Sequence, residues 1–290
     1  MIQIAVLGYG TIGSGVVEVL KVNKDSITKR VGDEIFVKYI LDLREFPGDP
    51  MEDKIVHDYA VIQNDPEVAI VVEAMGGVEP AYTFVKRALL NGRSVATSNK
   101  ELVAKHGAEL IAIAHEKNIN FLFEASVGGG IPIIRPLGSC LAANEISEIY
   151  GILNGTTNYI LTKMIKEGLS FDTALKQAQE KGYAEADPTA DVEGFDACRK
   201  ICILASLSFG RHVYPAQVPT QGITGVTAQD VALAEAAGMK IKLLGRAILQ
   251  EDGKVVAYVA PHLIPADQQM AGVEDVFNGI VVRGDAIGDV

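Results

Sequence analysis

Three glycines close to the amino terminus constrain the fold of this chain more than any other feature. Gly8, Gly10 and Gly13 directly follow an apolar run at residues 2–7, and residues 12–22 carry apolar side chains at helical spacing. In such a strand, turn and helix, the first glycine permits a tight turn and the second lets a phosphate approach the backbone, while the third lets the helix pack on the strand. Backbone N–H groups at the helix start would then face a pyrophosphate. The pattern predicts a dinucleotide-binding turn, with a purely structural turn as the alternative.

The first half of the chain alternates between apolar runs and helical patterns. Runs typical of buried strands recur at residues 36–41, 68–74, 94–97 and 120–123. Helical patterns lie between them at residues 80–90 and 108–117. Residues 24–35 carry no such pattern and are interpreted as an inserted loop. Buried strands that alternate with helices predict an α/β domain over residues 1–132, with a Rossmann-type, doubly wound parallel sheet.

A different pattern begins after a glycine-rich segment at residues 124–132, which we interpret as part of the hinge between two domains. One strand, three helices and a hairpin are predicted at residues 146–153, 158–166, 171–181, 194–207 and 242–260. The hairpin strands, residues 242–249 and 255–260, are separated by Glu251, Asp252 and Gly253, which favour a turn. The sequence therefore predicts a second, α+β domain over residues 133–290.

Charge and composition exclude several classes of protein. The 290 residues include 37 acidic and 26 basic side chains, and the net charge of −11 would repel nucleic acid and anionic lipid. No apolar stretch reaches the length that spans a bilayer, and the amino terminus leads into a strand pattern without a signal-peptide core. Cys140, Cys198 and Cys202 are too few for a disulfide framework or a zinc site, so we expect buried free thiols. These features predict a cytoplasmic protein that binds neither nucleic acid nor membrane.

The end of the second predicted strand bears on the choice of coenzyme. An acidic side chain there accepts a hydrogen bond from the ribose 2′-hydroxyl of NAD, whereas a nearby arginine accommodates the 2′-phosphate of NADP. Asp42 ends this strand and Arg44 lies two residues further on. The pair leaves both NAD and NADP open, and a structural Asp42 in a turn is a further alternative.

Two lysines are candidates for chemistry on a carbonyl group. Hydride transfer to a carbonyl carbon builds negative charge on the oxygen, so the reaction needs a positioned proton donor. Lys100 follows a predicted strand end, where parallel sheets bind their ligands. Lys200 lies four residues after Asp196 on a predicted helix, so the carboxylate can orient the ammonium. From spacing alone, a solvated surface pair is the more common arrangement of two such residues.

Five segments taken together resemble the homoserine dehydrogenase family, in the same order and over almost the whole chain. They are residues 8–13, 97–100, 124–132, 154–159 and 182–200, which read GYGTIG, TSNK, EASVGGGIP, NGTTNY and GYAEADPTADVEGFDACRK. The last two are far more specific than the glycine turn. The resemblance implies reversible, NAD(P)H-dependent reduction of L-aspartate 4-semialdehyde to L-homoserine, a step of the aspartate-derived pathway to threonine and methionine.

The resemblance also implies roles for individual residues. Lys200 would donate a proton to the developing alkoxide, and Lys100 would lie between nicotinamide and substrate. Glu185 and Asp196 would bind and orient the substrate, and Gly155 would approach substrate or coenzyme closely. The coenzyme would be held by Gly8, Gly10, Thr11, Ile12, Gly13, Asp42, Arg44, Thr97, Ser98 and Lys100.

A cation and an assembly follow from the same resemblance. Glu124 and the backbone carbonyls of Val127, Gly129 and Ile131 would bind a monovalent cation, sodium or potassium, because oxygen ligands suit a hard ion. The second domain would form a homodimer or a higher homo-oligomer.

Two features depart from the family pattern. The family often has a basic residue just before the acidic one at the end of the second strand, where this chain has Leu41, and this weakens an NADP preference. The chain ends at Val290, without the closing segment or the regulatory domain that many members carry, so feedback control by threonine does not follow. The alternatives are another NAD(P)-linked dehydrogenase of a small amino acid or semialdehyde, and a dinucleotide-binding regulator without turnover.

Overall fold

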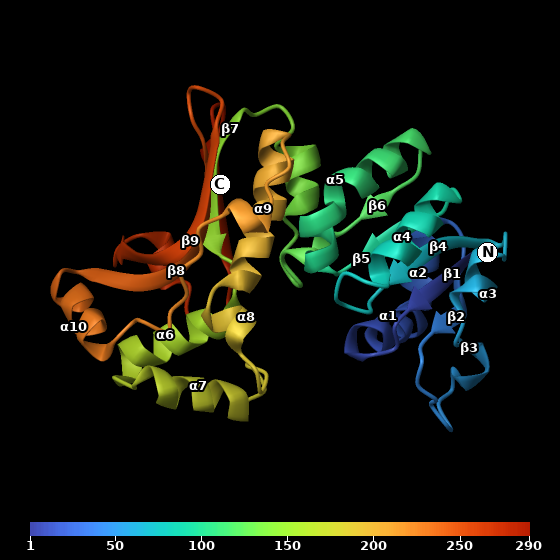
Figure 1. Cartoon of the computed structure of the whole chain (residues 1–290), viewed down its shortest axis with the longest axis horizontal. Helices are drawn as coiled ribbons and strands as arrows, with labels where there is room; N and C mark the ends of the chain where they lie inside the picture. Colours follow the sequence, from blue (N-terminus) through green and yellow to red (C-terminus); the bar gives the residue numbers. More distant parts are fainter. The chain divides into compact units, whose positions relative to one another are not determined.

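The computed structural model describes all residues from 1 to 290 and divides into two compact units, Met1–Gly130 and Ile131–Val290. Figure 1 colours the first unit from blue to green and the second from green to red. In neither unit does a helix combine the length and the apolar character needed to cross a membrane.

The first unit is built on a sheet of six parallel strands in the order β3-β2-β1-β4-β5-β6 (Figure 1). The strands are β1 (Ile2–Leu7), β2 (Ile35–Leu41), β3 (Ile55–Val56), β4 (Val68–Glu73), β5 (Ser94–Thr97) and β6 (Phe121–Leu122). The helices are α1 (Thr11–Val22), α2 (Lys24–Val31), α3 (Tyr59–Gln63), α4 (Ala81–Leu90) and α5 (Lys100–Glu116), with short turns η1 (Glu52–Lys54) and η2 (Glu124–Ser126). This confirms the predicted Rossmann-type sheet. The strand order reverses between β1 and β4, the point at which such sheets bind ligands.

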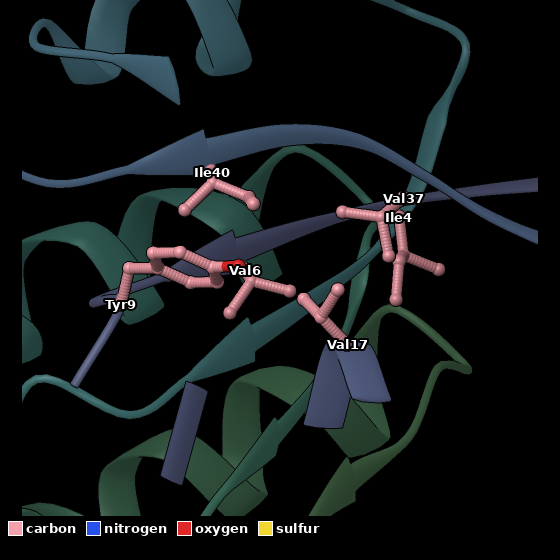
Figure 2. Close-up of a cluster of buried hydrophobic side chains, with 6 residues drawn as sticks. All are labelled: Ile4, Val6, Tyr9, Val17, Val37 and Ile40. Atoms are coloured by element: carbon pink, nitrogen blue, oxygen red, sulfur yellow. The ribbon is translucent and has the colours of Figure 1, made fainter. Parts of the chain in front are cut away.

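Buried side chains of β1 and β2 fix the first strand and helix (Figure 2). Ile4 pairs with Val37 and Val6 with Ile40, and a register shift after Ile4 lets these side chains join one cluster. Val17 of α1 packs in the same cluster, and all five residues are at most 8% exposed. The cluster therefore packs α1 against β1, the two elements that the glycine turn connects.

Two helices of the first unit differ from the prediction. Residues 24–35 were expected to form a loop but contain α2, which ends at Gly32 with a φ of +83°. Lys29 and Arg30 lie in its last turn, where they complement the helix dipole. None of its residues is buried, so apolar periodicity could not reveal it. Helix α5 begins at Lys100 instead of residue 108, because the Asn99 side chain caps it.

The second unit contains a five-stranded antiparallel sheet in the order β11-β10-β7-β8-β9 (Figure 1). Its strands are β7 (Ile146–Ile152), β8 (Met239–Leu249), β9 (Val255–Pro265), β10 (Gly279–Gly284) and β11 (Gly288–Asp289). Its helices are α6 (Gly155–Glu167), α7 (Phe171–Glu180), α8 (Thr189–Val192), α9 (Phe195–Phe209) and α10 (Ala228–Ala236), with short turns η3 (Pro136–Cys140), η4 (Pro215–Gln217) and η5 (Gln269–Gly272). The α+β class is confirmed, although β10, β11, α8 and α10 were not predicted.

Helix α9 packs closely against the sheet of the second unit. A Cβ atom at Gly245 of β8 would lie 3.0 Å from Cβ of Ile201, so any larger residue there would displace the helix. The thiols of Cys198 and Cys202 on α9 are buried and free, as expected. Cys140 is exposed, and the expectation of burial was wrong for it because its turn lies at the surface of the unit.

Candidate functional site

The three amino-terminal glycines form the turn between β1 and α1. Gly8 has a φ of +94°, and a Cβ atom there would lie 2.9 Å from the carbonyl oxygen of Ala74. A Cβ atom at Gly13 would lie 1.9 Å from the carbonyl oxygen of Gly8. Nothing lies within 4 Å of the corresponding position at Gly10, so the backbone at the helix start is open. Two glycines therefore close the turn, and the third leaves room for a ligand.

A cavity of about 520 Å³ opens beside this turn within the first unit. Gly8, Gly10, Asp42, Arg44 and residues 74–76 line it, so the ends of β1, β2 and β4 all contribute. Its size lies in the range of small-molecule sites. The cavity therefore extends from the glycine turn to the two residues that were expected to select the coenzyme.

Six other predicted coenzyme residues lie outside the lining of this cavity. Gly13 is buried under the turn, and Thr11 and Ile12 begin α1 with exposed side chains. Thr97, Ser98 and Lys100 stand at the end of β5 and the start of α5.

The carboxylate of Asp42 is held from two sides. Its Oδ2 accepts hydrogen bonds from the backbone N–H of Tyr9 at 2.8 Å and from Nη2 of Arg44 at 2.9 Å. Its Oδ1 accepts from Nε and from the backbone N–H of Arg44, both at 3.0 Å. The Arg44 guanidinium holds the pKa of Asp42 well below its usual range. The Asp42 side chain is 10% exposed and that of Arg44 is 61% exposed, so only the arginine is free to reorient in solvent.

His57, which no sequence motif singled out, lies beside this pair. Nδ1 of His57 donates to the backbone oxygen of Asp42 at 2.6 Å, and its Nε2 lies 3.0 Å from Glu45. The hydrogen bond to Asp42 and the charge of Glu45 raise the pKa of His57. Two basic side chains, Arg44 and His57, thus line the same end of the cavity.

Polar side chains at the ends of β4 and β5 are joined by hydrogen bonds. Thr97 is 5% exposed, and its hydroxyl donates to Glu73 and accepts the Asn99 N–H at 2.9 Å. The Asn99 side chain accepts the Leu102 N–H at 3.1 Å and so caps α5, whose first residue is Lys100. Sequence reasoning missed Glu73, because it lies in the apolar run of β4.

The second unit contains the predicted ammonium–carboxylate pair. Nζ of Lys200 lies 2.8 Å from Oδ2 of Asp196 and donates to the backbone oxygen of Leu153 at 2.7 Å. The Asp196 side chain is 3% exposed and that of Lys200 is 14% exposed. The pair is therefore not the solvated surface pair that spacing alone favoured.

Asn154 joins this pair to a second carboxylate. Its Nδ2 donates to Oδ2 of Asp196 at 2.9 Å and to Oδ1 of Asp191 at 2.7 Å, while its Oδ1 accepts the Thr157 N–H and caps α6. Asn154 begins the segment NGTTNY, but the sequence assigned no role to it. An asparagine directly before a helical pattern is a capping signal, and it could have marked the residue.

Two other predicted site residues of the second unit, Gly155 and Glu185, differ in burial and in their contacts. Gly155 begins α6, and a Cβ atom there would lie 2.7 Å from the carbonyl oxygen of Val276. Close packing against Val276 therefore explains why this position is a glycine. Glu185 is exposed between α7 and α8.

The residues of the predicted cation loop lie where the chain passes from the first unit to the second. Glu124 begins the turn η2, Val127 is 2% exposed and Gly129 is exposed. Ile131 is the first residue of the second unit.

The glycine turn and the cavity define a dinucleotide-binding domain, and the buried Lys200–Asp196 pair is a candidate proton donor. Together they define the class of NAD(P)-dependent oxidoreductases. Comparison with known proteins gives the family. The model described as "Homoserine dehydrogenase" matches residues 132–290, and "Homoserine dehydrogenase, NAD binding domain" matches residues 8–124.

Individual relatives agree with these matches. The homoserine dehydrogenase of Synechocystis sp. is 44% identical over 294 residues, covering 100% of this chain and 68% of the relative. The structure of a homoserine dehydrogenase from Thiobacillus denitrificans has a TM-score of 0.93 at 43% identity, covering 100% of this chain and 67% of that one. A hyperthermophilic archaeal homoserine dehydrogenase in complex with NADPH has a TM-score of 0.80 at 28% identity, covering 100% and 90%.

The chain belongs to the homoserine dehydrogenase family, whose members are NAD(P)-dependent oxidoreductases that act on a CH–OH group. It spans about two thirds of the length of the Synechocystis relative.

Proposed function

We propose that this chain catalyses the reversible reduction of L-aspartate 4-semialdehyde to L-homoserine with NADPH or NADH, in the pathway to threonine and methionine. The observation that carries the proposal is the buried pair of Lys200 and Asp196. An ammonium has three N–H donors, and two of them are directed at Asp196 and at the oxygen of Leu153. One donor of Lys200 is left for a substrate oxygen.

Proton transfer in this reaction is assigned to Lys200. When bound, the reduced coenzyme supplies a hydride to the carbonyl carbon. Lys200 donates a proton to the carbonyl oxygen as the new C–H bond forms, so the product is a hydroxyl group and the neutral amine regains its proton from solvent. Asp196 orients the ammonium, and Asn154 holds Asp196. In the reverse direction, the neutral amine accepts the hydroxyl proton.

Substrate-binding roles are assigned to individual residues, as the family resemblance implies. Glu185 carries an exposed carboxylate that can pair with the amino group of the substrate, and Asp196 orients the reacting end. Lys100, placed by the capped start of α5, lies between nicotinamide and substrate in this proposal. Close approach of substrate or coenzyme to Gly155 stays a prediction.

The end of the cavity at Asp42 supports use of both coenzymes. Asp42 accepts the ribose 2′-hydroxyl of NAD when Arg44 turns away from it. Arg44 and His57 both line the cavity. Arg44 supplies positive charge for the 2′-phosphate of NADP, and His57 adds to it when it is protonated. Which coenzyme binds more tightly depends on how readily Arg44 leaves Asp42.

The remaining family expectations are also part of the proposal. Glu124 and the backbone carbonyls of Val127, Gly129 and Ile131 would supply only oxygen ligands, which suit sodium or potassium. We propose a homodimer or higher homo-oligomer, and a cytoplasmic location that is supported by three free thiols.

A steady-state assay with both coenzymes tests the proposal. Oxidation of NADPH or NADH should be driven by L-aspartate 4-semialdehyde far better than by oxaloacetate or an unrelated aldehyde. Equal rates with all these substrates would contradict the assignment of homoserine as the product. Coenzyme binding without turnover would favour a dinucleotide-binding regulator. A series of sodium and potassium chloride in the same assay tests the cation, and light scattering tests the oligomer.

A further inference from the structure

Glu73 is a buried carboxylate at the point where the coenzyme sheet binds its ligand. It is the last residue of β4 and is 1% exposed. Strand β4 lies between β1 and β5, so Glu73 stands between the glycine turn after β1 and the polar segment after β5. Burial of a carboxylate is unfavourable unless hydrogen bonds compensate for the lost water.

The donors to Glu73 come from the two loops that follow β4 and β5. Its Oε1 accepts the backbone N–H of Met75 at 2.8 Å and of Gly76 at 3.3 Å, and Nδ2 of Asn99 lies 3.5 Å away. Its Oε2 accepts the hydroxyl of Thr97. One carboxylate therefore ties two separate loops together.

The first of these loops lines the coenzyme cavity. Residues 74–76 form part of the cavity wall. The backbone of Ala74 packs so closely against Gly8 that a Cβ atom at Gly8 would lie 2.9 Å from the carbonyl oxygen of Ala74. Gly76 and Gly77 have φ values of +79° and +69°. Because glycine adopts many backbone conformations, contacts from outside the loop are needed to fix its shape. The backbone N–H groups of Met75 and Gly76 make such contacts when they donate to the Glu73 carboxylate.

The second loop carries Lys100. Thr97 donates to Glu73 and accepts the N–H of Asn99, and Nδ2 of Asn99 donates to the backbone oxygen of Gly77 at 2.6 Å. The same asparagine caps α5 through the Leu102 N–H. The start of α5, and with it Lys100, is therefore placed by bonds that lead back to Glu73.

We propose that Glu73 is a positioning residue for hydride transfer, which holds the coenzyme-facing loop 74–77 and the start of α5 in one fixed arrangement. The proposal rests on the proposed function for the identity of the reaction and for the role of Lys100. It differs from a purely stabilising role in its effect on folded protein. A carboxylate that only stabilised the unit would change the melting temperature and leave kcat and coenzyme Kd unchanged below that temperature.

Glu73→Gln is the first variant, because the amide keeps the shape but replaces one acceptor oxygen with a donor. Not all the donors around Glu73 can then be satisfied. We expect kcat with the semialdehyde to fall at least about tenfold, because a small displacement of reacting groups has large effects on rate. We also expect the Kd of NADP⁺, measured by calorimetry, to rise several-fold. Glu67→Gln is the matched control: this carboxylate precedes β4, pairs with Lys38 at the surface and should leave both quantities unchanged.

Thr97→Val is the second variant, because it keeps the size of the side chain and removes only the hydroxyl that joins Glu73 to Asn99. The loop 74–77 keeps its bonds to Glu73, so we expect kcat to fall, with a smaller rise in the Kd of NADP⁺ than Glu73→Gln causes. Wild-type kcat and Kd in both variants would overturn the proposal, whatever their melting temperatures. If Glu73→Gln does not fold, wild-type kcat in Thr97→Val alone overturns it.

The same experiments distinguish a failure of the proposed function from a failure of the role of Glu73. A wild-type chain without turnover would contradict the proposed function, and the rise in Kd for Glu73→Gln would then still test the placement of loop 74–77. A wild-type chain with turnover and unchanged variants would contradict only the role of Glu73.

Discussion

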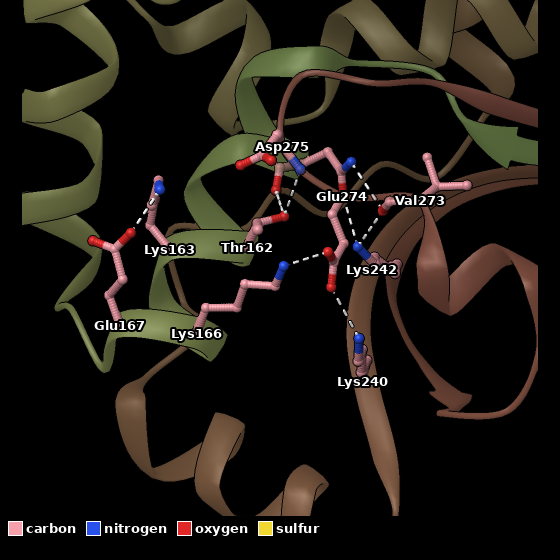
Figure 3. A network of polar contacts seen from close by, with 10 residues as sticks. Thr162, Lys163, Lys166, Glu167, Lys240, Lys242, Val273, Glu274 and Asp275 are labelled. Carbon is pink, nitrogen blue, oxygen red and sulfur yellow. Dashed lines mark hydrogen bonds and ion pairs between the residues drawn. The ribbon is translucent and has the colours of Figure 1, made fainter.

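Lys242 offers a sharp test of the energetics of the second unit. This lysine of β8 is 1% exposed, and its ammonium donates to Oδ1 of Asn158 at 3.0 Å. It also donates to the backbone oxygen of Val273 at 2.5 Å (Figure 3). Burial, together with the positive charge of Lys240, lowers the pKa of Lys242 to about 8. Glu274, Lys166 and Asp275 are the other charged groups that influence it.

The lowered pKa sets the direction of the effect of pH on stability. The unfolded chain binds a proton at Lys242 up to its ordinary pKa of 10.5, whereas the folded chain releases it near pH 8. The unfolded state therefore binds more protons between these values, and the contribution of Lys242 to stability rises with pH in this window and is lost as pH falls through 8. From pH 7 to pH 9.5, the two pKa values give a gain of about 2 kcal/mol.

Replacement of Lys242 with methionine removes this titration and keeps the apolar stem. We expect the free energy of unfolding of the wild type, relative to Lys242→Met, to increase by about 2 kcal/mol between pH 7 and pH 9.5. Urea unfolding of both proteins at the two pH values measures it. The hydrogen bond from Lys166 lowers the pKa of Glu274, so this carboxylate stays ionised in both proteins over the interval and adds no difference between them.

The control is a lysine on the surface of the same unit. Lys163 pairs with Glu167 one turn further along α6, and this hydrogen bond raises the pKa of Lys163 (Figure 3). Lys163→Met should therefore show no relative change over the same interval. A Lys242→Met difference that does not depend on pH would refute the reasoning that the ammonium is buried at a free-energy cost.

Three further substitutions test the site. Gly13→Ala places a methyl group against the oxygen of Gly8 and should abolish NADP⁺ binding in calorimetry, whereas Gly15→Ala, with open space around it, should not; equal binding by both would contradict the role of the turn. Asn154→Ser keeps a helix cap but loses the amide that holds Asp196, so kcat should fall about tenfold while the free energy of unfolding changes by less than about 1 kcal/mol; an unchanged kcat would remove Asn154 from the site. Arg44→Ala should weaken NADP⁺ about tenfold and leave NAD⁺ unchanged or tighter, because Asp42 is released; equal losses for both coenzymes would contradict the assignment.

The architecture of the first unit could be predicted because its signals are local. Apolar runs of strand length, separated by helical patterns, gave β1, β2, β4 and β5, and the three glycines marked the turn. Helix α2 escaped because none of its residues is buried. Strands β10 and β11 were not predicted, because β10 forms by pairing with β7, which lies more than a hundred residues earlier in the chain.

The candidate site was predictable only in part, because several of its contacts join residues that are far apart in the chain. Lys200 and Asp196 share a helix, so their spacing alone suggested a contact. The bond from Asn154 to Asp196 joins residues 42 positions apart, and no periodicity encodes it. Glu73 looks like an ordinary strand residue until β4 and β5 are placed side by side.

The measurement that most directly tests the account is the reduction of L-aspartate 4-semialdehyde by NADPH in wild type and Lys200→Ala. We expect kcat to fall at least about 100-fold, because a proton donor acts in the transition state, and the Kd of NADPH to stay within about twofold. A variant that keeps most of the wild-type kcat would contradict the assignment of Lys200 as the proton donor, and that role would then move to Lys100.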